Sequence, residues 1–148
     1  MMNRVRSALV LTLTTIAAAG CNLTGTTDGA GARNLDDVIF LALSEPPNAH
    51  MDALFNGTVT IDAAGCIRLQ NAERSTVVWP YGFTLDDSDD QLRVRDASGR
   101  VLGRVGGTFR FGGGHVPELH EGIDLTQAQR ERARTSCPGD FWIVGDTD

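Results

Sequence analysis

Ala53-Leu54-Phe55-Asn56-Gly57-Thr58-Val59-Thr60-Ile61 is the stretch that decides the fold. Ala53, Phe55, Gly57, Val59 and Ile61 alternate with the remaining positions, the period of two that is typical of a strand with one buried face. Asp62-Ala63-Ala64-Gly65 then predicts a turn, and residues 66–69 predict the returning strand. The stretch therefore predicts a β-hairpin.

More short strands follow, with turn signals roughly every ten residues. The predicted strands are residues 75–79, 82–85, 92–95, 101–105, 108–111 and 141–144. Residues 112–114 are three glycines, and we interpret them as a tight bend that ends the strand before them. A phosphate-binding loop is the alternative, but the Lys and Ser or Thr that it requires do not follow.

The strand pattern predicts an all-β fold, a small closed or partly open barrel with one short late helix. That helix is expected at residues 125–134, with Asp124 as its cap and Gln127 completing a capping pair. Gly57 and Gly103 are expected to let the strands curve. This arrangement resembles an OB-type barrel, a resemblance of architecture that implies no activity.

Residues 34–50 precede the first long strand and are expected to form a lead-in segment that packs on the barrel. Within it, Leu35 to Leu43 is mostly apolar, and the pattern fits a short capped helix or a buried strand equally well. We therefore expect residues 34–148 to form a single small β-barrel domain with this lead-in segment.

The first residues of the chain have the pattern of an export signal. Arg4 and Arg6 precede an apolar run from Ala8 to Ala19, and this run is shorter than the ~20 residues that span a bilayer. The small residues Ala18-Ala19-Gly20 before Cys21 resemble a bacterial lipoprotein signal. The resemblance implies a signal peptide at residues 1–20, lipidation of Cys21 and a flexible tether at residues 21–33. Plain secretion without lipid is the alternative.

The charge of the chain restricts its partners. The 148 residues have a formal net charge of −6, and loss of Arg4 and Arg6 with the signal changes it to −8. An acidic protein is a poor partner for nucleic acid, whose binding depends on neutralising phosphates. We therefore expect no nucleic-acid partner.

Two of the three cysteines remain after Cys21 is assigned to lipid. An even pair in an exported domain predicts a Cys66–Cys137 disulfide. Two buried free thiols are the alternative. Neither cysteine has a second Cys or His at zinc-finger spacing, so a zinc site is not expected.

The body of the chain also resembles an uncharacterised domain of bacterial envelope proteins. The matching pieces are Gly65-Cys66, residues 78–80, residues 112–114, and residues 137–139 with residues 142–144. The resemblance implies location in the cell envelope and no particular activity.

Three groups of residues are candidate sites. His115, Glu118, His120 and Glu121 offer metal-ligand chemistry, although a polar surface loop is the simpler interpretation because the spacing fits no metal motif. Trp79, Tyr81 and Phe83 form either an aromatic platform for a sugar or peptide, or part of the core. His115 is a further candidate ligand-binding residue beside these three. A third group, the aspartates 86, 87, 89 and 90, offers calcium ligands but has no EF-hand spacing, and a solvated turn is the alternative.

From these observations we expect a lipid-anchored protein on the extracytoplasmic side of a membrane. Its expected role is a non-catalytic binding or structural module, with an envelope protein or a glycan as partner and with no cofactor. The alternative is an envelope hydrolase or a metal-assisted enzyme that uses His115 and His120.

Overall fold

The computed structural model describes residues 34–48, 51–145 and 147. The predicted signal peptide (1–20) and tether (21–33), with Cys21, lie outside the described residues and remain predictions.

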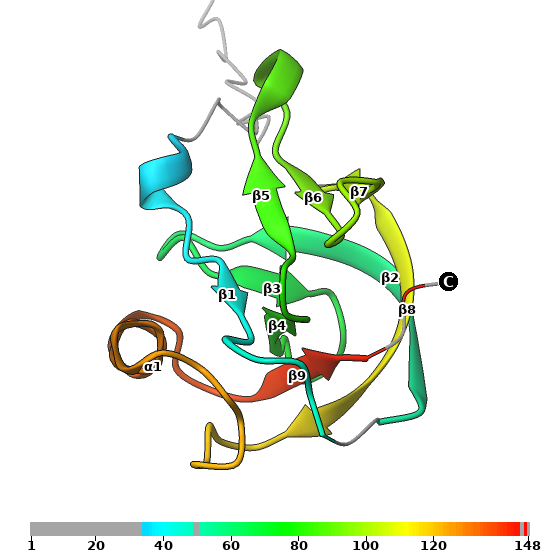
Figure 1. Ribbon diagram of the computed structural model, residues 1–148. Coiled ribbons are helices and arrows are strands. Elements are labelled where there is room, and N and C mark those ends of the chain that lie inside the picture. Colours follow the sequence, from blue (N-terminus) through cyan, green and yellow to red (C-terminus); the bar gives the residue numbers. More distant parts are fainter. Residues whose placement is uncertain (1–33, 49–50, 146, 148) are drawn as a thin grey trace, which may run out of the picture.

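Five strands close into the barrel that the sequence predicts (Figure 1). They are β2 (Ala53–Ile61), β3 (Ile67–Leu69), β4 (Thr76–Trp79), β8 (Thr108–Val116) and β9 (Phe141–Val144). Their order is β4-β3-β2-β8-β9, and the ring closes because β9 also pairs with β4. Neighbouring strands are antiparallel except β4 and β9, which are parallel.

Strand alternation sends one set of side chains into the barrel, as the period of two predicts. On β4, Val77 and Trp79 belong to the interior cluster, whereas Val78 belongs to a second cluster outside the barrel. The alternating pattern of the sequence predicts nine mostly buried side chains, of which six are buried and three are half-buried. The buried ones are Val59, Ile67, Leu69, Val78, Val94 and Phe109; the half-buried ones are Ile61, Val105 and Ile143.

Aromatic rings fill the barrel interior in a continuous series. Trp79 stacks on Phe40 and Phe83 and meets Phe111 edge-on at 5.6 Å between centroids. Phe111 in turn contacts Phe55. Pairs of this kind stabilise by more than their buried area alone, so this series is a principal element of the core.

Three of the predicted strands form a separate sheet and are not part of the barrel. These are β5 (Thr84–Asp86), β6 (Arg93–Arg95) and β7 (Val101–Arg104), with the 3₁₀ turn η2 (Ser88–Asp90) between β5 and β6. The sheet packs against one end of the barrel (Figure 1), where Val94 is fully buried. A Cβ on Gly103 would lie 2.8 Å from the Phe109 ring, so this glycine gives the ring room to pack, and the sequence interpretation of Gly103 as a barrel curvature point is wrong.

The three glycines do not bend the chain out of its strand. β8 continues through residues 112–114 to Val116 and pairs there with β9. A Cβ on Gly113 would lie 2.4 Å from Nε1 of Trp142, and one on Gly114 would lie on the Met51 side chain. Glycine is therefore required by close packing across the strand, and the predicted bend is wrong.

The lead-in segment contains both of the structures that its pattern allowed. A 3₁₀ turn, η1 (Leu35–Asp37), precedes the short strand β1 (Leu41–Ala42). β1 runs parallel to β4 and pairs with Val78 and Trp79. It lies along one edge of β4, and β9 lies along the other. The segment thus packs on the barrel as expected.

The late helix is present two residues further along than predicted. α1 (Gln127–Ser136) has Thr126 as its N-cap, and the Thr126 hydroxyl and Gln129 amide form a capping box. Asp124 and Gln127 are therefore not the capping pair. Ala133 is the buried residue of the helix, so most of its face is exposed, as its thin apolar face predicts.

Candidate functional site

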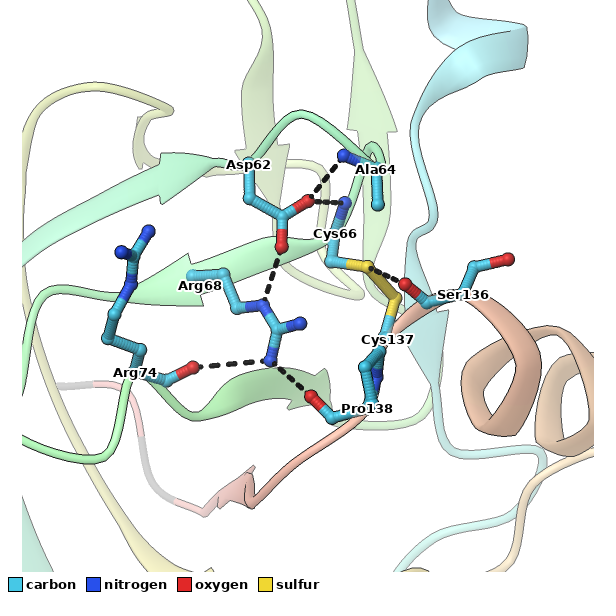
Figure 2. Close-up of a disulfide and its surroundings, with 8 residues drawn as sticks. All are labelled: Asp62, Ala64, Cys66, Arg68, Arg74, Ser136, Cys137 and Pro138. Carbon is cyan, nitrogen blue, oxygen red and sulfur yellow. Dashed lines mark hydrogen bonds and ion pairs between the residues drawn. A yellow bond between two sulfur atoms is a disulfide. The ribbon is translucent and has the colours of Figure 1, made fainter.

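The predicted disulfide is present and ties the end of α1 to the first hairpin (Figure 2). Cys66 and Cys137 are bonded, with Cα atoms 5.7 Å apart, although 71 positions separate them in the sequence. Both cysteines are fully buried. The pairing expected from the cysteine count is confirmed.

Arg68 forms a second link beside the disulfide (Figure 2). Its Nε donates to Oδ2 of Asp62 at 2.9 Å, and its Nη1 donates to the carbonyl oxygens of Pro138 at 3.1 Å and Arg74 at 3.3 Å. Arg68 is only 9% exposed. Arginine is rarely buried to this extent unless its guanidinium is paired, as it is here. The guanidinium therefore joins the two turns that flank β3 to the segment after α1, which lies 70 positions away in the sequence.

Asp62 is held in its ionised form by this arrangement. Partial burial raises the pKa of Asp62. The hydrogen bonds from Arg68, Cys66 and Ala64, together with the charge of Arg68, lower the pKa by more than burial raises it. The net result is a pKa below the usual 3.8. The carboxylate also accepts the backbone N–H groups of Ala64 and Cys66, and so fixes the turn between β2 and β3.

Together these contacts cover the outer surface of β3 and β4. Thr76 is fully buried there, and its backbone N–H donates to the Asp140 carbonyl at 2.8 Å. A second apolar cluster, which includes Leu41, Val78 and Phe141, fills the space under α1.

In OB-type barrels the second and third strands carry the ligand face. In this chain the equivalent surface is buried under the chain's own residues.

α1 is held in place by polar contacts as well. Gln129 donates to the Ala42 carbonyl at 3.1 Å, and Arg132 donates to the Asp36 carbonyl at 3.2 Å. Arg130 donates to the carbonyls of His120 and Ile123. The helix is thus joined to the lead-in segment and to the loop that precedes it, which compensates for its narrow apolar face.

The predicted histidine segment does not converge on one point. Nε2 of His115 lies 3.0 Å from Oδ2 of Asp140, and both side chains are partly exposed. His120 instead accepts the backbone N–H of Gly122 through Nδ1. In the part of the chain that the structure describes, no three His, Cys, Asp or Glu side chains group in a way that suits a metal ion.

A hollow of about 240 Å³ lies beside the disulfide. It is lined by Pro117, Glu118, Leu119, Arg134, Cys137, Pro138, Gly139 and Phe141. Leu119 and Phe141 are only 5% and 4% exposed, so the apolar floor offers little surface to a ligand. The hollow is a weak candidate for a binding site.

The three aromatic residues of the second predicted site are separated by their burial. Trp79 is fully buried, Phe83 is half-buried against it, and Tyr81 is 51% exposed. Trp79 therefore belongs to the core, which was the alternative interpretation. A platform of all three rings does not form, and Tyr81 alone offers its ring to solvent.

The acidic loop after β5 is organised by its own hydrogen bonds. The Asp86 carboxylate accepts the hydroxyl and backbone N–H of Ser88 and pairs with Arg95. Hydrogen bonds from Ser88 and Arg95 lower the pKa of Asp86 to about 2. Asp96 forms the same kind of turn, and hydrogen bonds from Ser98 and Arg100 lower its pKa to about 2. These aspartates stabilise turns of the β5–β7 sheet.

Sequence reasoning missed Arg68, Asp62 and Asp140. An aspartate that starts an Asp-Ala-Ala-Gly turn is a recognisable turn signal, and it suggests a role for Asp62. Arg68 alternates with buried residues and looks like a solvent-facing arginine, since the segment that covers it lies 70 positions away. No local signal marks Asp140.

No family model, curated protein or solved structure matches the chain. The resemblance to an envelope domain therefore stays a prediction. None of the helices in the described part of the chain has both the length and the apolar character to cross a membrane.

Proposed function

We propose that the protein is a membrane-anchored lipoprotein of the cell envelope whose barrel is a non-catalytic binding or structural module. The observation that carries this proposal is the buried Cys66–Cys137 disulfide together with Cys21 at the end of an export signal. Structural disulfides persist in oxidising compartments and are rare in the cytoplasm. Two acyl chains on Cys21 give stable anchoring.

The contacts of the titratable residues support a non-catalytic role. His115 and Asp140 contact each other, and among the described residues neither side chain is hydrogen-bonded to a serine, threonine or cysteine that could serve as nucleophile. Asp62, Asp86 and Asp96 are engaged in turns and ion pairs. Each of these three aspartates therefore has a structural role.

The anchoring is tested with Cys21→Ser. The wild type is expected in the membrane fraction with the added mass of acyl chains, and the variant in the soluble fraction. A wild-type chain that is soluble and carries no added mass contradicts the proposal. Replacement of Ser7 by Ala is the matched control, since it changes the leader and leaves the lipid acceptor intact.

An enzyme is the second candidate, because the 3.0 Å contact of His115 with Asp140 is one that can orient an imidazole for proton transfer. The enzyme would be an envelope hydrolase or a metal-assisted enzyme that uses His115 and His120. Loss of a cellular function in His115→Ala, with the fold and the membrane location unchanged, favours the enzyme. Unchanged function favours the binding module, whose protein or glycan partner is found by capture from the native membrane.

A further inference from the structure

The barrel offers solvent one sheet surface that the described chain does not cover. The outer sides of β3, β4 and β9 lie under the disulfide, α1 and the lead-in segment. β2 and β8 lie on the side of the barrel away from α1 (Figure 1), and their outward positions are at least partly exposed or carry no side chain.

We name this surface the open face. It consists of Leu54, Asn56 and Thr58 on β2 and Thr108, Arg110 and Gly112 on β8. The strand register sets Leu54 opposite Gly112, Asn56 opposite Arg110, and Thr58 opposite Thr108. Paired positions of this kind have side chains close enough to act on one ligand.

The open face differs in charge from the rest of the chain. The chain has a formal net charge of −6, yet the six residues of the open face include no carboxylate. The Arg110 side chain is exposed and has no hydrogen bond or ion pair to any residue of the described part. Arg68, Arg95 and Arg100 pair with Asp62, Asp86 and Asp96. The side chains of Arg74, Arg104 and Arg134 are like that of Arg110 in having no hydrogen bond or ion pair to a described residue. An unpaired guanidinium on an acid-free surface complements an anion.

The remaining side chains suit a sugar. The Asn56 amide donates and accepts hydrogen bonds, and the hydroxyls of Thr58 and Thr108 do the same. Leu54 is 61% exposed and lies opposite Gly112, which has no side chain, so Leu54 offers an apolar contact on this surface. Hydroxyls, an amide and one apolar contact on a sheet surface match the alternating polar and apolar surfaces of a sugar ring.

We propose that the open face binds an acidic polysaccharide whose sugars carry carboxylate groups. Arg110 holds one carboxylate by a bidentate contact, Asn56 and the threonines bind neighbouring hydroxyls, and Leu54 packs on a ring face. This inference rests on the proposed binding role and names its surface and its ligand class.

Calorimetric titration of the full chain in detergent with an oligogalacturonate tests the proposal. The matched neutral probe is the same oligosaccharide with its carboxyl groups reduced to alcohols. The acidic probe is expected to bind, the neutral probe to bind at least tenfold more weakly, and Arg110→Gln to lose about tenfold or more in affinity for the acidic probe. Asn56→Ala is expected to weaken both probes, because its amide contacts hydroxyls.

Arg134→Gln is the control, since it removes the same charge from α1, on the other side of the barrel and beside the hollow. It is expected to bind like the wild type. Equal binding of both probes, unchanged affinity in Arg110→Gln, or loss of binding in Arg134→Gln would overturn the proposal. Absence of binding by the folded wild type also overturns it, while leaving the anchoring through Cys21 to its own test.

Discussion

A Cβ atom added to Gly113 of β8 would lie 2.4 Å from the indole Nε1 of Trp142, which belongs to the neighbouring strand β9. It would also lie 2.3 Å from the carbonyl oxygen of Ile143. Both distances are far below van der Waals contact. The absence of a side chain at Gly113 is therefore what allows Trp142 to close this part of the barrel.

Gly113→Ala is expected to destabilise the fold by about 1–3 kcal/mol, the usual cost of forcing extra atoms into a packed interior. The measurement is the free energy of unfolding in urea. Gly99→Ala is the control, because its added Cβ meets nothing within 4 Å and carries only the cost of a left-handed backbone. If the two variants lose the same free energy, the packing argument at Trp142 is wrong.

Arg68→Met is expected to lower the free energy of unfolding by about 2–3 kcal/mol. Methionine keeps most of the length of the side chain but removes the guanidinium that donates to Asp62 and to the carbonyls of Arg74 and Pro138. Arg100→Met removes the exposed ion pair with Asp96 and is expected to cost no more than about 1 kcal/mol. An Arg68→Met variant as stable as Arg100→Met argues against the proposed linkage of segments.

The lowered pKa of Asp62 makes stability depend on pH. Because the pKa is lower in the folded chain than its unfolded value of 3.8, the ionised carboxylate stabilises the fold above that value. This contribution is lost as the pH falls through the folded pKa. The difference in unfolding free energy between the wild type and Asp62→Asn should therefore shrink between pH 6 and pH 2. A difference that stays constant contradicts the assignment.

The Cys66→Ala/Cys137→Ala double variant is expected to unfold more easily by on the order of 4 kcal/mol, since the bond closes a loop of 71 residues. The midpoint of thermal unfolding should fall by several degrees or more. A thiol count on the unfolded, non-reduced Cys21→Ser chain should find no free thiol. Two free thiols would show that the bond is absent.

The strands were predictable because their signal is local. Alternation in residues 53–61 gives β2 and its buried face from neighbouring positions alone. The capping box of α1 is also local, but Asp124 and Thr126 both have cap chemistry, and the sequence does not rank them. The existence of the helix was therefore predicted correctly, but its start was placed two residues too early.

What could not be predicted depends on contacts between distant segments. Glycines 112–114 predict a bend by their own flexibility, whereas in the structure they pair with β2 and with β9, which are far away in the sequence, and so continue β8. Arg68 looks exposed until Pro138 covers it. The open face also depends on contacts between distant segments. Asn56 lies opposite Arg110 only because β2 pairs with β8, and these two strands are more than 40 positions apart in the sequence.

The central claim is that α1 and the disulfide cover the β3–β4 side of the barrel and leave the open face free. Hydrogen–deuterium exchange on the oxidised chain tests it directly. The Thr76 amide, which donates to Asp140, should exchange slowly, and α1 should gain exchange when Cys66 and Cys137 are replaced by alanine. Rapid exchange at Thr76 and throughout α1 in the oxidised wild type would contradict the account.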